Sequence, residues 1–515
     1  MNRRHKICTA QEAAALVPDH AVLAASGHMN SGLAEALCIA LEERFLREGH
    51  PRGLTLVSGS GAGDRGTPET AYRGFEHFAH DGMTERVIVG HNGSNHRLIR
   101  MQEDHRVTGY NFPQGVVEQL LRERSRGMGF LVTRTGLGTF MDPRQSGGRM
   151  DPAAPEMVHL TKILGQDYLV YEMPPVDVAL IRGTVADEDG NLSCCEEAAL
   201  TNIRTAAMAA KASGGIVLCQ VKKIVPRGTL PAAEIHVPGM FVDRLILCGN
   251  PERDHRMTQG TVYEPSYAGQ AIIGEKAPKC SEGRTPDRKK IIARRVLLEL
   301  QPGKPVNLGI GLPELVAEAA AEEGILDRLM LTVDTGVIGG VPAGGESFGA
   351  AAYPSAFLEA AQIYDLYDGG FLDCACLGIA QCDPAGNVNA TAFPNLRGGL
   401  VHPGAGGFIN LTQGARTVVF CTAMTAGGRP KFVREIPQIS FAAKDALRRG
   451  QRVLYVTESG VFGLTDRGLC LQEIAPGADL EKDILQRMEF VPEIAADLGC
   501  MDRRIFMAGP MGLRF

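Results

Sequence analysis

A single acid stands where an apolar run opens into a glycine-rich loop. Residues 331–345 read LTVDTGVIGGVPAGG, so the strand-like start ends on Asp334, and glycine and proline follow. An ionised carboxylate only accepts hydrogen bonds and can act as a nucleophile toward an acyl carbon. The glycines remove side chains that would block a bulky partner, and backbone N–H groups there can stabilise an oxyanion. The stretch is therefore compatible with acyl chemistry at Asp334, but by itself it favours the alternative, an aspartate that caps the following turn.

The elements that must position this acid follow a repeated order. The run HAVLAASG precedes LAEALCIALEERFL, and PVNLGIGLP precedes ELVAEAAAEEG. Strand, glycine turn and helix in this order are typical of α/β folds with largely parallel sheets. In such folds ligands bind beyond the carboxyl ends of the strands, which is where Asp334 is expected to lie.

An internal sequence repeat predicts two related halves. DVALIRGTVADEDGN (177–191) and DCACLGIAQCDPAGN (373–387) align without a gap. We predict an α/β protein of two related open-sheet domains, residues 1–273 and 291–515, with the acid in the second. The charged, proline-bearing stretch 274–290 is the predicted linker. Basic residues gather at 288–295, at the end of this linker and just after it. We interpret them as a solvated linker and helix face, with phosphate binding as the alternative.

The composition is that of a globular protein and excludes several classes. Of 515 residues, 44% are hydrophobic and 22% charged, and the net charge is −6. This balance gives no argument for nucleic acid, and no apolar run approaches a membrane span. The start of the chain predicts a helix with a Thr9/Glu12 capping box rather than a signal peptide. Thirteen scattered cysteines lack metal-finger spacing and predict reduced thiols in a cytoplasmic protein without a metal site.

Ten segments carry a resemblance that spans nearly the whole chain. They are ALEERFLREGHPRGLTLV, NFPQGVV, GLGTFMDPRQSGG, DVALIRGTVADEDGN, NLGIGLPE, GVIGGVPAGGESFGA, YDGGFLD, GNVN, GAGGFINLTQGA and EIAPGADLEKDIL. In this order the chain resembles the class I coenzyme A transferases, of the single-chain bacterial acetate/propionate and short-chain 3-ketoacid type with fused α-like and β-like halves. The resemblance implies ping-pong transfer of CoA from an acyl-CoA to a free carboxylic acid. It also implies a homo-oligomer in which CoA is a substrate rather than a permanently bound cofactor.

The resemblance places Asp334 at the position of the family's nucleophile, which is usually a glutamate. An aspartate retracts the carboxylate by roughly 1.3 Å, whereas attack needs the reacting atoms about 3–3.5 Å apart. Our hypothesis is that transfer survives through an acyl anhydride and a CoA thioester on Asp334. The alternatives are hydrolysis of an acyl-CoA, or of the C–C bond of a β-ketoacyl-CoA, with Asp334 as general base, and a non-catalytic CoA-binding protein. Glu346, in the same loop, is another candidate carboxylate.

The resemblance also implies supporting residues. Gln114 corresponds to a glutamine that contacts the substrate carboxylate, and Asn389, with Asn387 as another register, to an asparagine near the acyl oxygen. Gly428 corresponds to a glycine whose N–H helps to form the oxyanion hole. The residues implied on the CoA side are Gly309, Gly311, Gly404, Gly406, Gly407 and, for a phosphate, Lys431. Departures from the family pattern at Thr391, Ala392 and Ser459, and the absence of tryptophan, predict an altered substrate.

Overall fold

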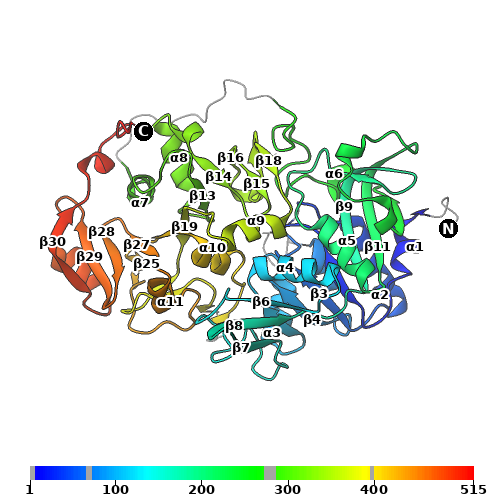
Figure 1. Cartoon of the computed structure of the whole chain (residues 1–515), viewed down its shortest axis with the longest axis horizontal. Helices are drawn as coiled ribbons and strands as arrows, with labels where there is room; N and C mark the ends of the chain where they lie inside the picture. The colour runs from blue at the N-terminus through cyan, green and yellow to red at the C-terminus, as the bar shows by residue number, and fades with distance from the viewer. Residues whose placement is uncertain (1–5, 30, 65–71, 272–285, 395–399, 515) are drawn as a thin grey trace.

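The computed structural model describes residues 6–29, 31–64, 72–271, 286–394 and 400–514. Figure 1 shows the two halves beside each other, the N-terminal half in blue to green and the C-terminal half in yellow-green to red. Helices α4 (Gln114–Ser125), α9 (Ala360–Asp368) and α10 (Phe408–Gly414) lie where the halves meet.

The N-terminal half is built on a nine-stranded sheet in the order β1-β12-β11-β9-β2-β3-β4-β5, with β10 paired to β9. Its strands are β1 (Ile7–Cys8), β2 (Val22–Ala25), β3 (Leu54–Ser58), β4 (Thr84–Val89), β5 (Thr108–Asn111), β9 (Val178–Asp187), β10 (Leu192–Ser193), β11 (Ile216–Val225) and β12 (Arg244–Leu247). Its other helices are α1 (Ala10–Ala14), α2 (Glu35–Glu48), α3 (His96–Glu103), α5 (Ile203–Ala212) and α6 (Pro251–Asp254). Helix α1 begins with the predicted capping box of Thr9 and Glu12, which is confirmed.

The C-terminal half contains a ten-stranded sheet in the order β18-β15-β14-β13-β19-β24-β27-β28-β29-β30. The strands are β13 (Pro305–Leu308), β14 (Met330–Thr332), β15 (Val337–Ile338), β18 (Ala356–Phe357), β19 (Cys374–Gly378), β24 (Thr417–Cys421), β27 (Arg452–Val456), β28 (Gly460–Thr465), β29 (Gly468–Ile474) and β30 (Glu493–Cys500). Its remaining helices are α7 (Arg288–Leu297), α8 (Glu314–Glu322) and α11 (Ala443–Arg448).

The two sheets share one central topology, which confirms the predicted pair of related open-sheet halves. Strands β3-β2-β9-β11-β12 and β14-β13-β19-β24-β27 are each parallel throughout. The repeated motif also forms the same turn twice. The N–H and side-chain amide of Asn191 donate to the Asp187 carboxylate at 2.9 Å each, and Asn387 donates to Asp383 in the same way at 2.9 Å each.

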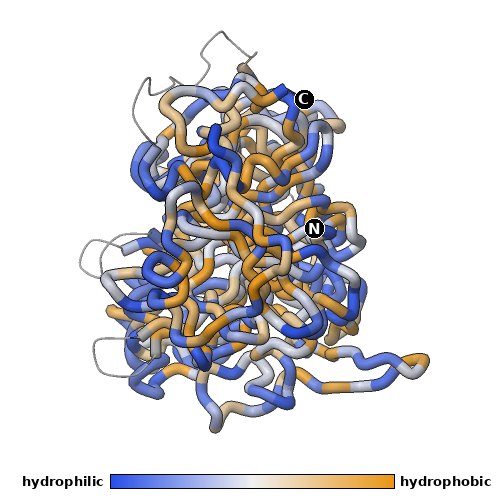
Figure 2. The backbone as a smooth tube through the Cα atoms, turned by 90° about the vertical axis from the view of Figure 1, so that its left-hand side faces the viewer, coloured by the Kyte–Doolittle hydropathy of each residue, from blue (hydrophilic) through white to orange (hydrophobic). Residues whose placement is uncertain are grey.

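Each central sheet is buried on both faces, as parallel sheets require. One hydrophobic cluster packs outside the N-terminal sheet and another outside the C-terminal sheet. A further cluster runs through both halves and includes Val117 of α4, Ala206 of α5, Ile363 of α9 and Ile409 of α10. Figure 2 shows the same distribution, with hydrophobic segments gathered in the interior. The halves are therefore joined by a common core.

Polar contacts add to the junction of the halves. The Gln119 side chain of α4 donates to Asp365 and Asp368 of α9, and the N–H of Gly115 donates to Asn410 of α10 at 3.1 Å. The end of the N-terminal half also reaches across, since the Tyr353 N–H donates to the Ser266 carbonyl at 2.9 Å.

The predicted linker is only partly described. Residues 274–285 lie outside the described residues, and 288–290 already belong to α7, which Asp287 caps. The interpretation of the basic group as solvated is wrong for two of its members. Arg294 is buried and donates to backbone carbonyls of residues 505, 507 and 509, and Arg295 pairs with Glu473 and Glu299. One face of α7 is a core face, and these guanidinium groups are bound within it.

A smaller antiparallel sheet stands apart from the two large ones. It contains β6 (Phe130–Thr133), β8 (Gln166–Glu172) and β7 (Val158–Ile163), in that order. No helix within the described ranges is long and apolar enough to cross a membrane. All cysteines in those ranges are free thiols.

Candidate active site between the halves

Asp334 lies two residues beyond the carboxyl end of β14, at the edge of the C-terminal sheet. A tight turn follows, in which the Val333 N–H bonds to Val337 and the Gly336 N–H returns to Val333. Gly336 has a φ of +105°, and a Cβ there would lie 2.0 Å from the Leu358 carbonyl oxygen. Only glycine fits this turn, so the glycine that follows Asp334 fixes where the strand ends and where the acid points.

The Asp334 carboxylate is buried, with 9% of the residue exposed, and it is nearly unpaired. Oδ2 accepts a hydrogen bond of 3.3 Å from the Tyr364 hydroxyl, whereas Oδ1 has no partner among the described residues. The turn that follows gives the carboxylate no backbone hydrogen bond, so the turn-cap interpretation is wrong. Buried polar atoms are rarely left unsatisfied without a functional reason. Oδ1 is therefore the oxygen that is available for chemistry.

Asp334 lines an inner cavity of about 190 Å³ that both halves enclose. The N-terminal half supplies mostly polar side chains, and the C-terminal half supplies Asp334, Asn307 and otherwise backbone and apolar groups. The wall is formed by His28, Met29, Ser60, His91, Gln114, Asn307–Ile310, Val333, Asp334, Phe348, Leu377, Gly378, Ala390, Gly404–Phe408 and Leu411. Neither half forms this cavity alone.

An outer cavity of about 650 Å³ adjoins the inner one and shares His91, Ile310, Gly378, Ala390 and Gly404 with it. The hairpin of β25 (Thr425–Ala426) and β26 (Arg429–Pro430) forms part of its wall. The two cavities therefore lie next to each other, and Asp334 lines the inner one.

Six predicted site residues meet at the inner cavity: Asp334, Gln114, Gly309, Gly404, Gly406 and Gly407. Gln114 is the first residue of α4, and its N–H donates to the Gly406 carbonyl at 2.8 Å. Its side-chain nitrogen lies 3.5 Å from Nδ1 of His28. This backbone hydrogen bond holds the glycine loop of the C-terminal half directly against the start of α4 in the N-terminal half.

At two positions of this loop there is no space for a side chain, so glycine is required. A Cβ on Gly404 would lie 2.7 Å from the Gly90 carbonyl oxygen, so its loop presses against the N-terminal half. A Cβ on Gly407 would lie 2.6 Å from the Tyr364 hydroxyl oxygen and 3.0 Å from Oδ2 of Asp334. Gly407 therefore makes room for the contact between the tyrosine and the acid.

Lys431 lies in the outer cavity and not beside Asp334. Its ammonium group donates to the Ile379 carbonyl at 2.7 Å. Burial lowers its pKa, against the opposing charge of Glu458. Its place in this wall is compatible with an anionic part of an extended substrate.

Four other candidates do not line the inner cavity as the described residues form it. The Asn389 side chain is buried and fully engaged, since it donates to Gln381 and Ala392 and accepts from the N–H groups of Thr391 and Ala392. Gly428 is exposed at the tip of the β25–β26 hairpin, and the exposed Gly311 donates to Glu314. Glu346 is exposed on a short 3₁₀ turn.

The sequence reasoning missed Tyr364, His28 and Phe348. Tyr364 lies on the buried face of α9, where an aromatic residue ordinarily indicates core packing. His28 and Phe348 come from opposite halves, and their rings lie 6.0 Å apart in the cavity wall. No local pattern links residues so distant in sequence.

A buried carboxyl behind the cavity, Glu118 of α4, is expected to be neutral. Burial, followed by the charges of Glu359 and Asp334, raises its pKa to about 8. Its Oε1 lies where a Cβ on Gly59 would stand, so it supports the loop that carries Ser60 into the cavity wall. At neutral pH this group adds no second full negative charge beside Asp334.

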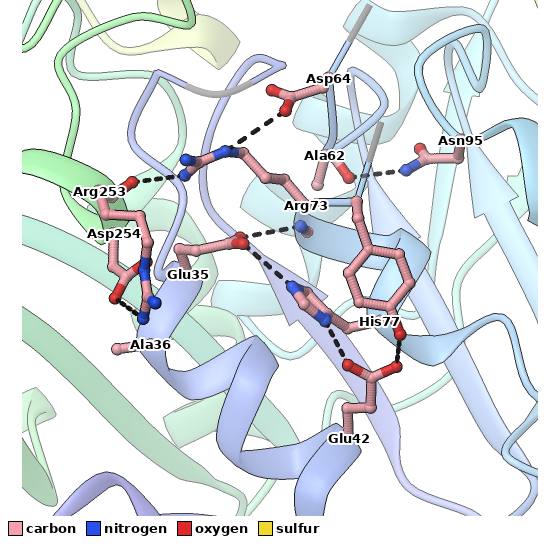
Figure 3. Close-up of polar contacts among 12 residues, drawn as sticks. Glu35, Ala36, Glu42, Ala62, Asp64, Arg73, His77, Asn95, Arg253 and Asp254 are labelled. Carbon is pink, nitrogen blue, oxygen red and sulfur yellow. Dashed lines mark hydrogen bonds and ion pairs between the residues drawn. The ribbon is translucent and has the colours of Figure 1, made fainter. Parts of the chain in front are cut away.

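The loop that follows β3 is anchored by the polar network in Figure 3. The buried His77 ring lies between two carboxylates, 3.0 Å from Glu35 and 2.6 Å from Glu42. Burial alone would lower the pKa of His77, but the two carboxylates outweigh it and raise the pKa to about 9. Asp64 pairs with Arg73 at 3.3 Å. The network fixes the described ends of this loop, including the side that leads to Ser60.

Comparisons with known proteins identify one family. A family model described as coenzyme A transferase matches residues 7–247. The caffeate CoA-transferase of Acetobacterium woodii is 36% identical over 97% of this chain and 97% of its own length. The acetate CoA-transferase YdiF of Escherichia coli K12 is 35% identical over 99% of this chain and 97% of its own length.

A solved structure extends the similarity to the fold. It is the acyl-CoA transferase YdiF of Escherichia coli O157:H7 in a thioester complex with CoA. This chain matches it with a TM-score of 0.89 at 33% identity, covering 100% of this chain and 98% of the other. Within the described residues, no group of histidines, cysteines and acids is placed to hold a metal ion.

Proposed function

Because the chain belongs to the coenzyme A transferase family and is a CoA-transferase, we propose that its reaction runs through Asp334. The donor is a short-chain acyl-CoA and the acceptor a free carboxylic acid. CoA is a substrate that binds along the outer cavity, with its thioester in the inner one. The observation that carries the proposal is the buried Oδ1 of Asp334, which has no partner in the part of the chain that the structure describes, at a cavity that needs both halves.

The proposed chemistry balances within the enzyme and its two substrates. Oδ1 of Asp334 attacks the thioester carbonyl, and the CoA thiolate leaves with the electrons of the C–S bond. The thiolate then attacks Cγ of the mixed anhydride, and the donor's acid departs with Oδ1. The product is an enzyme-CoA thioester. An acceptor carboxylate reverses the two steps, leaves one of its oxygens on Asp334 and departs as the new acyl-CoA.

The size of the inner cavity supports a short acyl group. A volume of about 190 Å³ corresponds to about six molecules of liquid water. In this proposal Gln114, the first residue of α4 and part of the cavity wall, donates a hydrogen bond to the carboxylate of the substrate without adding charge. Gly406 and Gly407 let the substrate approach the backbone closely.

Hydrolysis is the second candidate, with Asp334 as general base toward water. The retracted aspartate favours it, because a shorter side chain leaves more space at the carbonyl. Transfer and hydrolysis separate in one experiment. The enzyme is mixed with propionyl-CoA in ¹⁸O-labelled water, with and without acetate, and free thiol, labelled propionate and acetyl-CoA are measured.

We expect acetyl-CoA to form only with acetate and little solvent oxygen to enter propionate. In the Asp334→Asn variant the rates of acetyl-CoA formation and of propionate release should both fall by a factor of about 10³ or more, because the nucleophile is lost. Glu346→Gln is the matched control, an exposed carboxyl in the same loop, and should retain activity. If CoA is released without acetate and each propionate carries one solvent oxygen, the reaction is hydrolysis and not transfer.

A homo-oligomer is also proposed, through the outer face of the β6–β8 sheet. Phe130 and Val132 are exposed on that face, and the buried Leu131 between them points inward. Ile163 is exposed near the β7–β8 turn, and Leu164 in that turn is 99% exposed. Exposed apolar side chains gathered in this way are typical of an association surface.

A further inference from the structure

We propose that the Tyr364 hydroxyl is a catalytic oxyanion donor, which acts on Oδ2 of Asp334 when the CoA thiolate attacks the aspartyl anhydride. The inference rests on the proposed function, because it assigns a role to the second oxygen of the same nucleophile. It divides the carboxylate into two atoms with different tasks. Oδ1 attacks and leaves with the acid, whereas Oδ2 stays bonded to Cγ and carries the developing charge.

The geometry places the tyrosine against one oxygen only. Its hydroxyl donates to Oδ2 at 3.3 Å, and Oδ1 is unpartnered among the described residues. Burial, followed by the charge of Asp334, holds the pKa of Tyr364 well above its usual value. The hydroxyl therefore stays protonated and remains a donor throughout turnover.

The length of the contact fits a role in the transition state. An O–H···O bond is usually about 2.7–2.8 Å long, so the contact with the resting carboxylate is weak. In the tetrahedral intermediate the full negative charge moves onto Oδ2, and a donor to an oxyanion binds more strongly and at shorter range. An interaction that strengthens on the way to the transition state accelerates the reaction.

The surroundings hold the hydroxyl in this place. A Cβ on Gly115 would lie 2.4 Å from the Tyr364 ring, so α4 packs directly on the ring of α9. The missing side chain of Gly407 leaves the space for the hydroxyl. The Tyr367 ring, at 5.7 Å and nearly perpendicular, packs against the Tyr364 ring. The donor is thus preorganised by both halves, which is the condition for effective oxyanion stabilisation.

Tyr367 provides a matched control on the same helix. It is equally buried, and its hydroxyl donates to Thr332 at 2.9 Å and accepts from Asn307 at 3.4 Å. Within the described residues its hydroxyl makes no hydrogen bond to Asp334, so it serves the packing of β14 and β13. Tyr364→Phe and Tyr367→Phe each remove one buried hydroxyl, but only the first removes a contact with the nucleophile.

The test follows the single turnover of each variant with propionyl-CoA by rapid quench and mass spectrometry. Tyr364→Phe should slow the formation of the enzyme-CoA thioester by about 10²-fold, the usual loss for one oxyanion donor. The KM for propionyl-CoA should stay within about twofold, because binding is unaffected. The anhydride should also survive longer, so that a larger share of propionate carries solvent oxygen. Tyr367→Phe should change neither the rate nor that share, although both variants lower the melting temperature.

Equal losses in the two variants, a loss confined to KM, or an unchanged rate in Tyr364→Phe would overturn the inference. The failure of the proposed function looks different. If the wild-type enzyme forms no CoA adduct on Asp334, the proposed function falls and this inference falls with it. If the adduct forms at an equal rate in the wild type and in Tyr364→Phe, only the role of the tyrosine is lost.

Discussion

At the scale of single residues, Gly407 defines the environment of the nucleophile by lacking a side chain. Gly407→Ala introduces a Cβ that would lie 2.6 Å from the Tyr364 hydroxyl oxygen and 3.0 Å from Oδ2 of Asp334. We expect kcat to fall by about 10- to 100-fold, because a displacement of about 1 Å at a reacting group costs that much. Steady-state kinetics give the measurement. Gly249→Ala, where a Cβ meets nothing within 4 Å, is the control, and equal activity of the two variants would contradict the prediction.

The length of the acidic side chain gives a second prediction at this scale. Asp334→Glu extends the carboxylate by about 1.3 Å toward the thioester but withdraws it from Tyr364. We expect transfer to acetate to persist and its rate to depend less on Tyr364. The test compares the effect of Tyr364→Phe in the two backgrounds by a double-mutant cycle. An unchanged effect of Tyr364→Phe in the Asp334→Glu background would show that the contact is not specific to the shorter acid.

At the scale of elements, the active site depends on how closely α4 approaches α9. Gly115 lies in the first turn of α4, and alanine at a helical glycine normally stabilises a helix by about 1 kcal/mol. Here the added Cβ would lie 2.4 Å from Tyr364 and 2.6 Å from Asn410, so we expect Gly115→Ala to destabilise the protein by about 1–3 kcal/mol. It should also lower kcat, because it displaces the ring that carries the hydroxyl.

Denaturant unfolding and turnover of the Gly115→Ala variant measure the two effects. A variant that is more stable than the wild type and fully active would show that the halves have room to separate at this helix pair.

The elements also show what the sequence could and could not predict. Strand–glycine–helix units and the repeated D-x-x-G-N turn depend on local spacing, so they predicted both sheets and the place of Asp334. The Tyr364 contact depends on the packing of α9 against α4, which are more than 230 residues apart, and no local pattern encodes it. Asn389 was assigned to the substrate, but the structure engages its side chain within its own loop, and the sequence does not reveal such hydrogen bonds.

At the scale of the whole molecule, His77 couples stability to pH. Its pKa is about 9 in the folded protein against about 6.5 for an ordinary histidine, so the protonated ring stabilises the fold. This stabilisation is complete below about pH 6.5 and is lost as the pH rises through 9, with a maximum of about 3 kcal/mol. We expect the free energy of unfolding to fall between pH 6.5 and 9.5 more in the wild type than in His77→Gln. Parallel pH profiles of the two proteins would contradict this.

Association is the other prediction at this scale. Leu164→Lys combined with Phe130→Lys places one charge in the β7–β8 turn and one on the outer face of the β6–β8 sheet, and burying an unpaired ammonium at an interface costs several kcal/mol. We expect a smaller particle in light scattering, while the melting temperature of the subunit changes little. An unchanged mass would place the contact between subunits elsewhere.

The most direct test of the central claim is the chemical identity of the residue that holds CoA. The enzyme is treated with propionyl-CoA in the absence of an acceptor, reduced with borohydride and mapped by peptide mass spectrometry. We expect the thioester to be reduced to an alcohol at Asp334, which becomes a homoserine residue, and Glu346 and Glu118 to be unchanged. Reduction at either glutamate, or an unmodified Asp334 in an enzyme that turns over, would contradict it.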